Sequence, residues 1–127
     1  MTKHALLVLV ALISLAGSVS AHHSYGAYQT DQVIAIEGSV VRIEFVNPHV
    51  NVMIKTRDGD YTAEFPAMRS LTQSNFKAWS LKIGDVVVAS GSPMKDREIH
   101  RISLMKEIRR PSDGWIWSSA PPTKPSN

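Results

Sequence analysis

The sequence of 127 residues contains no cysteine. This absence excludes a disulfide scaffold, a thiolate zinc site, an iron–sulfur cluster, a cysteine nucleophile and a lipid-modified N-terminal cysteine. The sequence also has little net charge, because 14 Lys and Arg against 11 Asp and Glu leave a formal value of +3. A charge of this size does not indicate nucleic-acid binding. The length allows one domain of ordinary size.

The sequence also lacks the common motifs of enzymes. It has no Gly-x-Ser-x-Gly elbow, no Gly-x-Gly-x-x-Gly and no phosphate-binding loop. Its carboxylates occur singly at expected strand surfaces and turns, without the spacing of an acid–base pair. We therefore expect a protein that binds a partner or a ligand, and not an enzyme.

Residues 1–21 have the layout of a secretory signal peptide. Lys3 supplies a positive charge, residues 5–16 are mostly apolar, and Val19 and Ala21 are the small side chains that signal peptidase requires. The apolar run is shorter than the roughly 20 residues that a membrane-spanning helix needs. We expect cleavage after Ala21, a periplasmic or secreted location and no stable membrane anchor afterwards. An uncleaved anchor is the alternative.

The mature chain is expected to be mainly β, after an N-terminal arm at residues 22–32. Alternation of apolar and polar residues predicts five strands, at residues 33–45, 50–55, 61–65, 86–89 and 98–108. Apolar residues near helical spacing predict one short helix over residues 67–79, between strands three and four. This order is that of a small five-stranded OB-like barrel over residues 33–108. An open β-sandwich is the competing fold.

The alternation also predicts which side chains face the core. One shared core is expected to contain Val41, Ile43, Phe45, Val52 and Val87. In the fifth strand, Ile102 and Leu104 are expected on one face, with Ile99 and Met105 on the other. Gly38 interrupts the first strand and predicts a bulge or a sharp bend, as a small barrel needs where a strand curls.

Residues 109–127 are expected to form a C-terminal tail that contains proline and tryptophan. The segment Trp115-Ile116-Trp117 has two interpretations. Its indole rings could dock a protein or a small ligand, or they could fold back over the open end of the barrel. The second interpretation is the one that we favour.

Histidine is the residue type that indicates a function. Two of the four histidines of the expected mature chain, His22 and His23, stand at its start. An N-terminal histidine offers its free amine and a ring nitrogen to one metal ion, and His49 could supply a third nitrogen. Such a set of ligands suits copper. If cleavage leaves Ala21 in place, the amine, two backbone amides and the ring of His23 form a different Cu(II) site.

Other interpretations of these residues stay open. Terminal histidines can simply be solvated, and His49 could hydrogen-bond to the backbone at a turn. His100 lies among charged residues and is expected at the surface. Met53, which alternation places on the face of His49, could add a thioether ligand or pack against a neighbour. The alternative function is a non-enzymatic module that binds a protein or a ligand through its barrel face or its tail.

Several motifs together resemble a family of small uncharacterised exported bacterial proteins. In this sequence they are Ala21-His22-His23-Ser24, residues 38–45, Asn47-Pro48-His49 and Leu81-Lys82-Ile83-Gly84-Asp85-Val86-Val87. They span most of residues 21–108. The resemblance implies a fold and an exported location but no activity, because the family is a domain of unknown function. From the residues themselves we predict an exported OB-like barrel that carries or senses copper through His22, His23 and His49.

Overall fold

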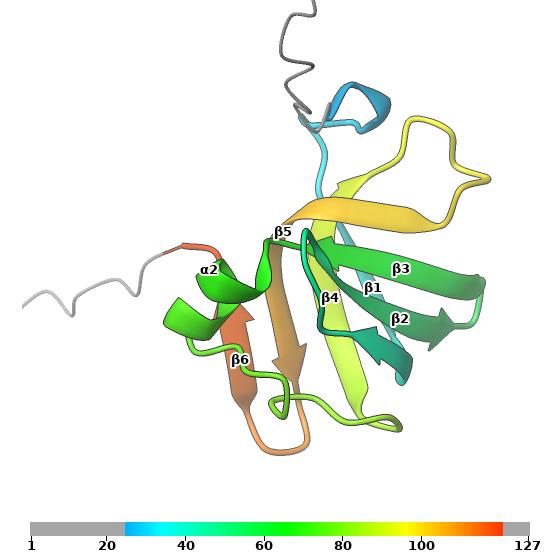
Figure 1. Ribbon diagram of the computed structural model, residues 1–127. Coiled ribbons are helices and arrows are strands. Elements are labelled where there is room, and N and C mark those ends of the chain that lie inside the picture. The colour runs from blue at the N-terminus through cyan, green and yellow to red at the C-terminus, as the bar shows by residue number, and fades with distance from the viewer. Residues whose placement is uncertain (1–24, 121–127) are drawn as a thin grey trace, which may run out of the picture.

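The computed structural model describes residues 25–120 of the chain. This part contains a short 3-10 helix, six strands and one short α-helix (Figure 1). In chain order they are η1 Tyr25–Ala27, β1 Ile34–Glu44, β2 Val50–Thr56, β3 Gly59–Phe65, α2 Met68–Gln73, β4 Val86–Pro93, β5 Arg101–Arg110 and β6 Trp115–Ser118.

Five of the strands close into a barrel. The sheet has the order β3-β2-β1-β4-β5-β6, and β3 also pairs with β5 in parallel. The other pairings are antiparallel, and α2 lies between β3 and β4 in the chain. This is the strand order of the five-stranded OB barrel, so the fold predicted from the sequence is confirmed. The sixth strand, β6, is an addition at the outer side of β5.

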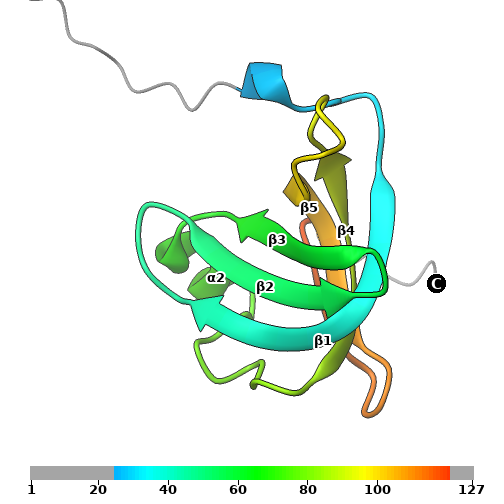
Figure 2. The same ribbon diagram turned by 90° about the vertical axis from the view of Figure 1, so that its right-hand side faces the viewer.

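Strand β1 is long and curved because it pairs with two different strands of the barrel (Figure 2). Its first half pairs with β4 and its second half with β2. A Cβ atom at Gly38 would lie 2.1 Å from the carbonyl oxygen of Lys55, so only glycine allows this approach. The register then shifts between Val40 and Arg42. Val40 is therefore buried and Val41 is 38% exposed, so the prediction that Val41 faces the core is wrong.

Strand β5 also departs from the expected alternation. Three of its residues, Leu104 to Lys106, stand opposite the single residue Gly91 of β4, and Leu104 has a φ of 50°. The strand bends sharply near its middle (Figure 1). Because the bulge resets the alternation, Ile102 and Met105 are both buried in the core. The prediction that these two side chains lie on opposite faces is wrong.

The helix is shorter than the sequence predicts. It ends at Gln73, where the expected helix runs to Trp79. Asn75 has a φ of 68°, which is incompatible with a continuing right-handed helix. Phe76 is buried after this reversal, and the chain then crosses to β4 through two turns that leave Trp79 largely exposed.

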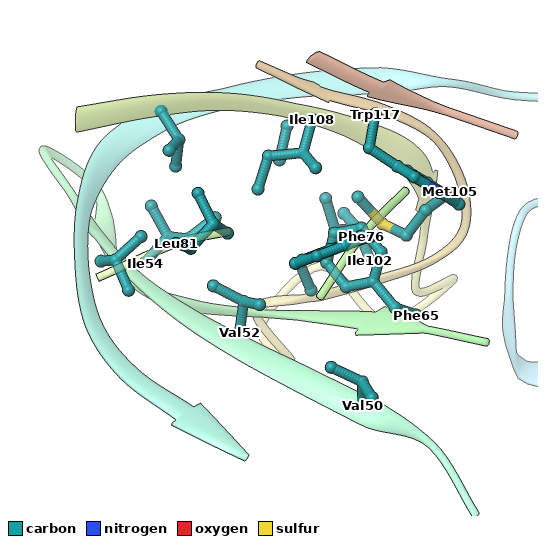
Figure 3. Close-up of a cluster of buried hydrophobic side chains, with 14 of the residues drawn as sticks. Val50, Val52, Ile54, Phe65, Phe76, Leu81, Ile102, Met105, Ile108 and Trp117 are labelled. Carbon is teal, nitrogen blue, oxygen red and sulfur yellow. The ribbon is translucent and has the colours of Figure 1, made fainter. Parts of the chain in front are cut away.

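The core fills the barrel and extends to β6 (Figure 3). Val52 and Val87 are fully buried, while Ile43 and Phe45 are partly buried and pack against the core. Within the segment expected as a tail, residues 115–118 form β6, and Trp117 is only 4% exposed. The rings of Phe65, Phe76 and Trp117 lie within 6.1 Å of one another, centroid to centroid. The interpretation in which the tail folds back onto the barrel therefore holds for Trp117.

Candidate functional site

The candidate site is a pocket at the seam of the barrel. β3 and β5 pair only at Thr62↔Arg101 and Ala63↔Ile102. Beyond these positions the two strands separate, and a pocket of about 470 Å³ lies between them. Its walls come from the end of β3 and residues 66–67, from residues 103–106 of β5, and from Pro48, His49, Tyr25 and Ser119.

The Asn-Pro-His motif is attached to the pocket wall at both of its ends. The Oδ1 atom of Asn47 accepts a hydrogen bond from the backbone N–H of Met68, at 3.3 Å. The ring of His49 hydrogen-bonds through Nδ1 to the carbonyl oxygen of Phe65, at 3.2 Å. Pro48 lies between these two contacts and its peptide bond with Asn47 is cis. The motif thus fixes the position of the imidazole against the connection that follows β3.

The hydrogen bond of His49 determines which ring nitrogen can bind a metal. A carbonyl oxygen only accepts, so Nδ1 is the protonated nitrogen of a neutral ring and Nε2 carries the lone pair. Nε2 itself is covered by the protein, so a metal ion would reach it only after neighbouring side chains move. Histidines that bind metals in proteins commonly donate their other N–H to a backbone carbonyl in this way. The donor set at His49 therefore fits a neutral imidazole ligand.

A polar cluster forms one side of the pocket. Arg101 donates to Oε2 of Glu64 at 2.6 Å, and the hydroxyl of Ser103 donates to Oε1 at 3.2 Å. Arg101 also donates to Oδ1 of Asn51, at 3.2 Å. Burial and, after it, the charge of Glu64 raise the pKa of Tyr28 in the same cluster. Both carboxylate oxygens of Glu64 are engaged, so this side chain supports the wall of the pocket.

The residues predicted from the sequence are only partly described. His49 lies in the pocket, whereas His22 and His23 lie outside the described residues. His100 does not line the pocket. Its ring stacks on Tyr61 with the centroids 4.5 Å apart, and it is half-buried where the sequence predicts a surface residue. Within residues 25–120, no group of three or more His, Cys, Asp or Glu side chains could hold a metal ion.

Sequence reasoning missed three residues of the pocket. Tyr25 follows His22 by three positions and lines the same pocket as His49. Glu64 and Ser103 meet only because β3 and β5 are neighbours, at a separation of 39 residues. Strand alternation along each segment carried no signal for these long-range contacts.

Among residues 25–120, no helix is both long enough and apolar enough to cross a membrane.

Comparison with known proteins identifies a family but no activity. Residues 9–103 match a family described as a family of unknown function (DUF6152). A search of curated proteins gives no match. The export that the sequence resemblance implies stays a prediction. Since the match covers most of the 127 residues, the chain belongs to this family of unknown function.

Proposed function

We propose that this chain is an exported protein that binds copper through His22, His23 and His49, and that it carries or senses the metal. The observation that supports this most is the position of Tyr25, the first described residue, in the wall of the pocket that contains His49. His22 precedes Tyr25 by three residues, which span at most about 11 Å when fully extended. This length keeps the expected mature N-terminus within about 11 Å of Tyr25, which borders the same pocket as His49.

The chemistry of the donors supports copper. Imidazole nitrogens have a high affinity for this metal, and a free amine together with the ring of His22 forms a chelate. Because Nδ1 is hydrogen-bonded to the carbonyl of Phe65, Nε2 would be the nitrogen through which His49 binds the metal. Metal binding requires deprotonated nitrogens, so protons compete with it. The proposal depends on export, because only cleavage after Ala21 makes the amine of His22 available.

The test is a calorimetric Cu(II) titration of the chain that begins at His22. This chain retains the whole described core, whose members all lie between residues 36 and 117. We expect His49→Ala to weaken Cu(II) binding by more than about tenfold. We expect a similar loss when one residue is added before His22, because the amine then leaves the chelate. Affinity should also fall as the pH is lowered.

The matched control is His100→Ala, which removes an imidazole that lies outside the pocket. It should leave the Cu(II) affinity nearly unchanged, because a half-buried ring stacked on Tyr61 offers at most weak adventitious binding. Far-ultraviolet circular dichroism of each variant reports whether the barrel is intact. If the extended chain, His49→Ala and His100→Ala all titrate like the parent chain, the copper proposal is wrong.

One observation favours a second candidate function. The pocket has a volume of about 470 Å³, much more than one metal ion fills, and its walls include Phe65, Leu104 and Met105. Pockets of this size commonly bind small ligands. A non-enzymatic ligand-binding module is therefore the alternative, with the pocket as its site. Quenching of tryptophan fluorescence by a set of small aromatic compounds, lost in a Leu104→Lys variant, would support it.

A further inference from the structure

The connection between α2 and β4 exposes two large apolar side chains on consecutive turns. The first turn begins at Lys77 and exposes Trp79 to 75%, and the second begins at Lys82 and exposes Ile83 to 73%. Leu81, between the turns, is 3% exposed and anchors the connection in the core. We call Lys77, Trp79, Lys82 and Ile83 the two-turn surface.

Hydrogen bonds hold both turns in place. The backbone N–H of Lys77 donates to Oγ of Ser80, and that of Lys82 donates to Oδ2 of Asp85, each at 2.9 Å. Arg110 of β5 donates to the carbonyl oxygen of Ser80 at 2.8 Å and to Asp85 at 2.6 Å. The exposed tryptophan therefore stands on a fixed support and not on a loose loop.

The charge around the two-turn surface is mainly positive. Residues 66–84 contain the basic side chains Arg69, Lys77 and Lys82 and no Asp or Glu. The neighbouring acidic side chains, Asp85 and Asp113, both form ion pairs with Arg110, and these three side chains together with the three basic ones carry two more positive than negative charges. Lys77 also donates to a carbonyl at the end of α2. An exposed indole beside unpaired positive charge fits an anionic partner.

We propose that the two-turn surface docks on an anionic lipid bilayer. Tryptophan is preferred at the boundary between lipid headgroups and acyl chains, and lysines beside it attract anionic headgroups. A stable protein partner buries about 800 Å² on each side, more than two large apolar side chains supply. The connection runs along the end of the molecule opposite η1 in both views (Figures 1 and 2), so docking leaves η1 and Tyr25 turned away from the lipid. This inference does not depend on the proposed copper site.

Vesicle binding tests the proposal with the chain that begins at His22. We expect it to co-sediment with phosphatidylglycerol vesicles and not with phosphatidylcholine vesicles, with a blue shift of the fluorescence of Trp79. Binding should weaken strongly at 1 M salt, where the screening length is about 3 Å. Trp79→Ala should weaken binding by about tenfold or more, and so should the double variant Lys77→Gln/Lys82→Gln.

The matched control is Ile99→Ala, which removes an apolar side chain that is 47% exposed on another loop. It should bind the anionic vesicles like the parent chain. Near-ultraviolet circular dichroism, which reports mainly on the packed rings of the core, should not change in Trp79→Ala. Equal binding by Trp79→Ala and Ile99→Ala would overturn the proposal. Absence of binding to phosphatidylglycerol vesicles would also overturn it, and would leave an acidic protein surface as the partner to seek.

Discussion

Replacement of Trp117 by alanine tests whether β6 belongs to the folded core. Trp117 packs with its ring centroid 5.4 Å from that of Phe65 and 6.1 Å from that of Phe76. Its Nε1 donates to Oγ of Ser74 at 2.9 Å, so the strand is tied to the end of α2 as well. Residues from β3, β6 and the segment after α2 thus meet at one indole. Its removal should loosen all three.

The stability that Trp117→Ala should lose follows from the buried area of the indole and from its hydrogen bond to Ser74. A buried tryptophan covers about 200 Å² or more, which at about 25 cal/mol per Å² corresponds to about 5 kcal/mol. The compactness of unfolded chains reduces this value, and measured losses for Trp→Ala in cores are about 3–5 kcal/mol. Trp117→Phe keeps a ring but removes the donor to Ser74, and should cost about 1–2 kcal/mol.

Urea unfolding followed by circular dichroism measures these free energies. The matched control is Ile116→Ala on the same strand, where the side chain is 51% exposed. This substitution should lower the free energy of unfolding by only about 0.5 kcal/mol. If Trp117→Ala and Ile116→Ala unfold at the same urea concentration, β6 is a tail and our account of the core is wrong. We assign most of the loss in Trp117→Ala to buried area and a smaller part to the hydrogen bond with Ser74. A Trp117→Phe variant as unstable as Trp117→Ala would contradict this assignment.

Two further predictions concern the backbone of the bulge and the pocket cluster. Gly91→Ala should destabilise by about 1–3 kcal/mol in urea, because its Cβ would lie 2.7 Å from the carbonyl oxygen of Ser103. Tyr28 has a pKa raised above 10.0 by burial, so its contribution is full below pH 10 and is lost as the pH rises through the folded-state value. From pH 9 to 11 the free energy of unfolding of the wild type should fall relative to that of Tyr28→Phe, and a constant difference would contradict this.

The topology could be predicted because its signals are local. The regular parts of the strands alternate, Asp58-Gly59 marks the turn between β2 and β3, and the order of elements then selects the OB barrel. The face of each residue could not be predicted past a bulge. In the pair Val40-Val41 both side chains are valine, so nothing in the sequence tells which one faces inward. The answer depends on the pairing of β1 with two different strands.

The candidate site could also be predicted only in part from local signals in the sequence. The Asn-Pro-His motif identified His49 as a special residue, because a break between two strands is visible in the sequence. The partners of the motif are not visible, since Phe65 contacts His49 from 16 residues away and Met68 contacts Asn47 from 21 residues away. The contribution of Tyr25 depends on where the N-terminal arm crosses the barrel, which only the assembled fold determines.

The failures of alternation and the location of the pocket have a common cause. Leu104, with its positive φ, begins the bulge that separates β5 from the end of β3, and Ser103 to Lys106 then line the pocket. A perfectly regular β5 would continue its pairing with β3 beyond Ala63 and close the seam. In this barrel, the irregular positions that lose strand pairing are therefore also the positions that form the pocket, and residues that break a local pattern are the first candidates for function.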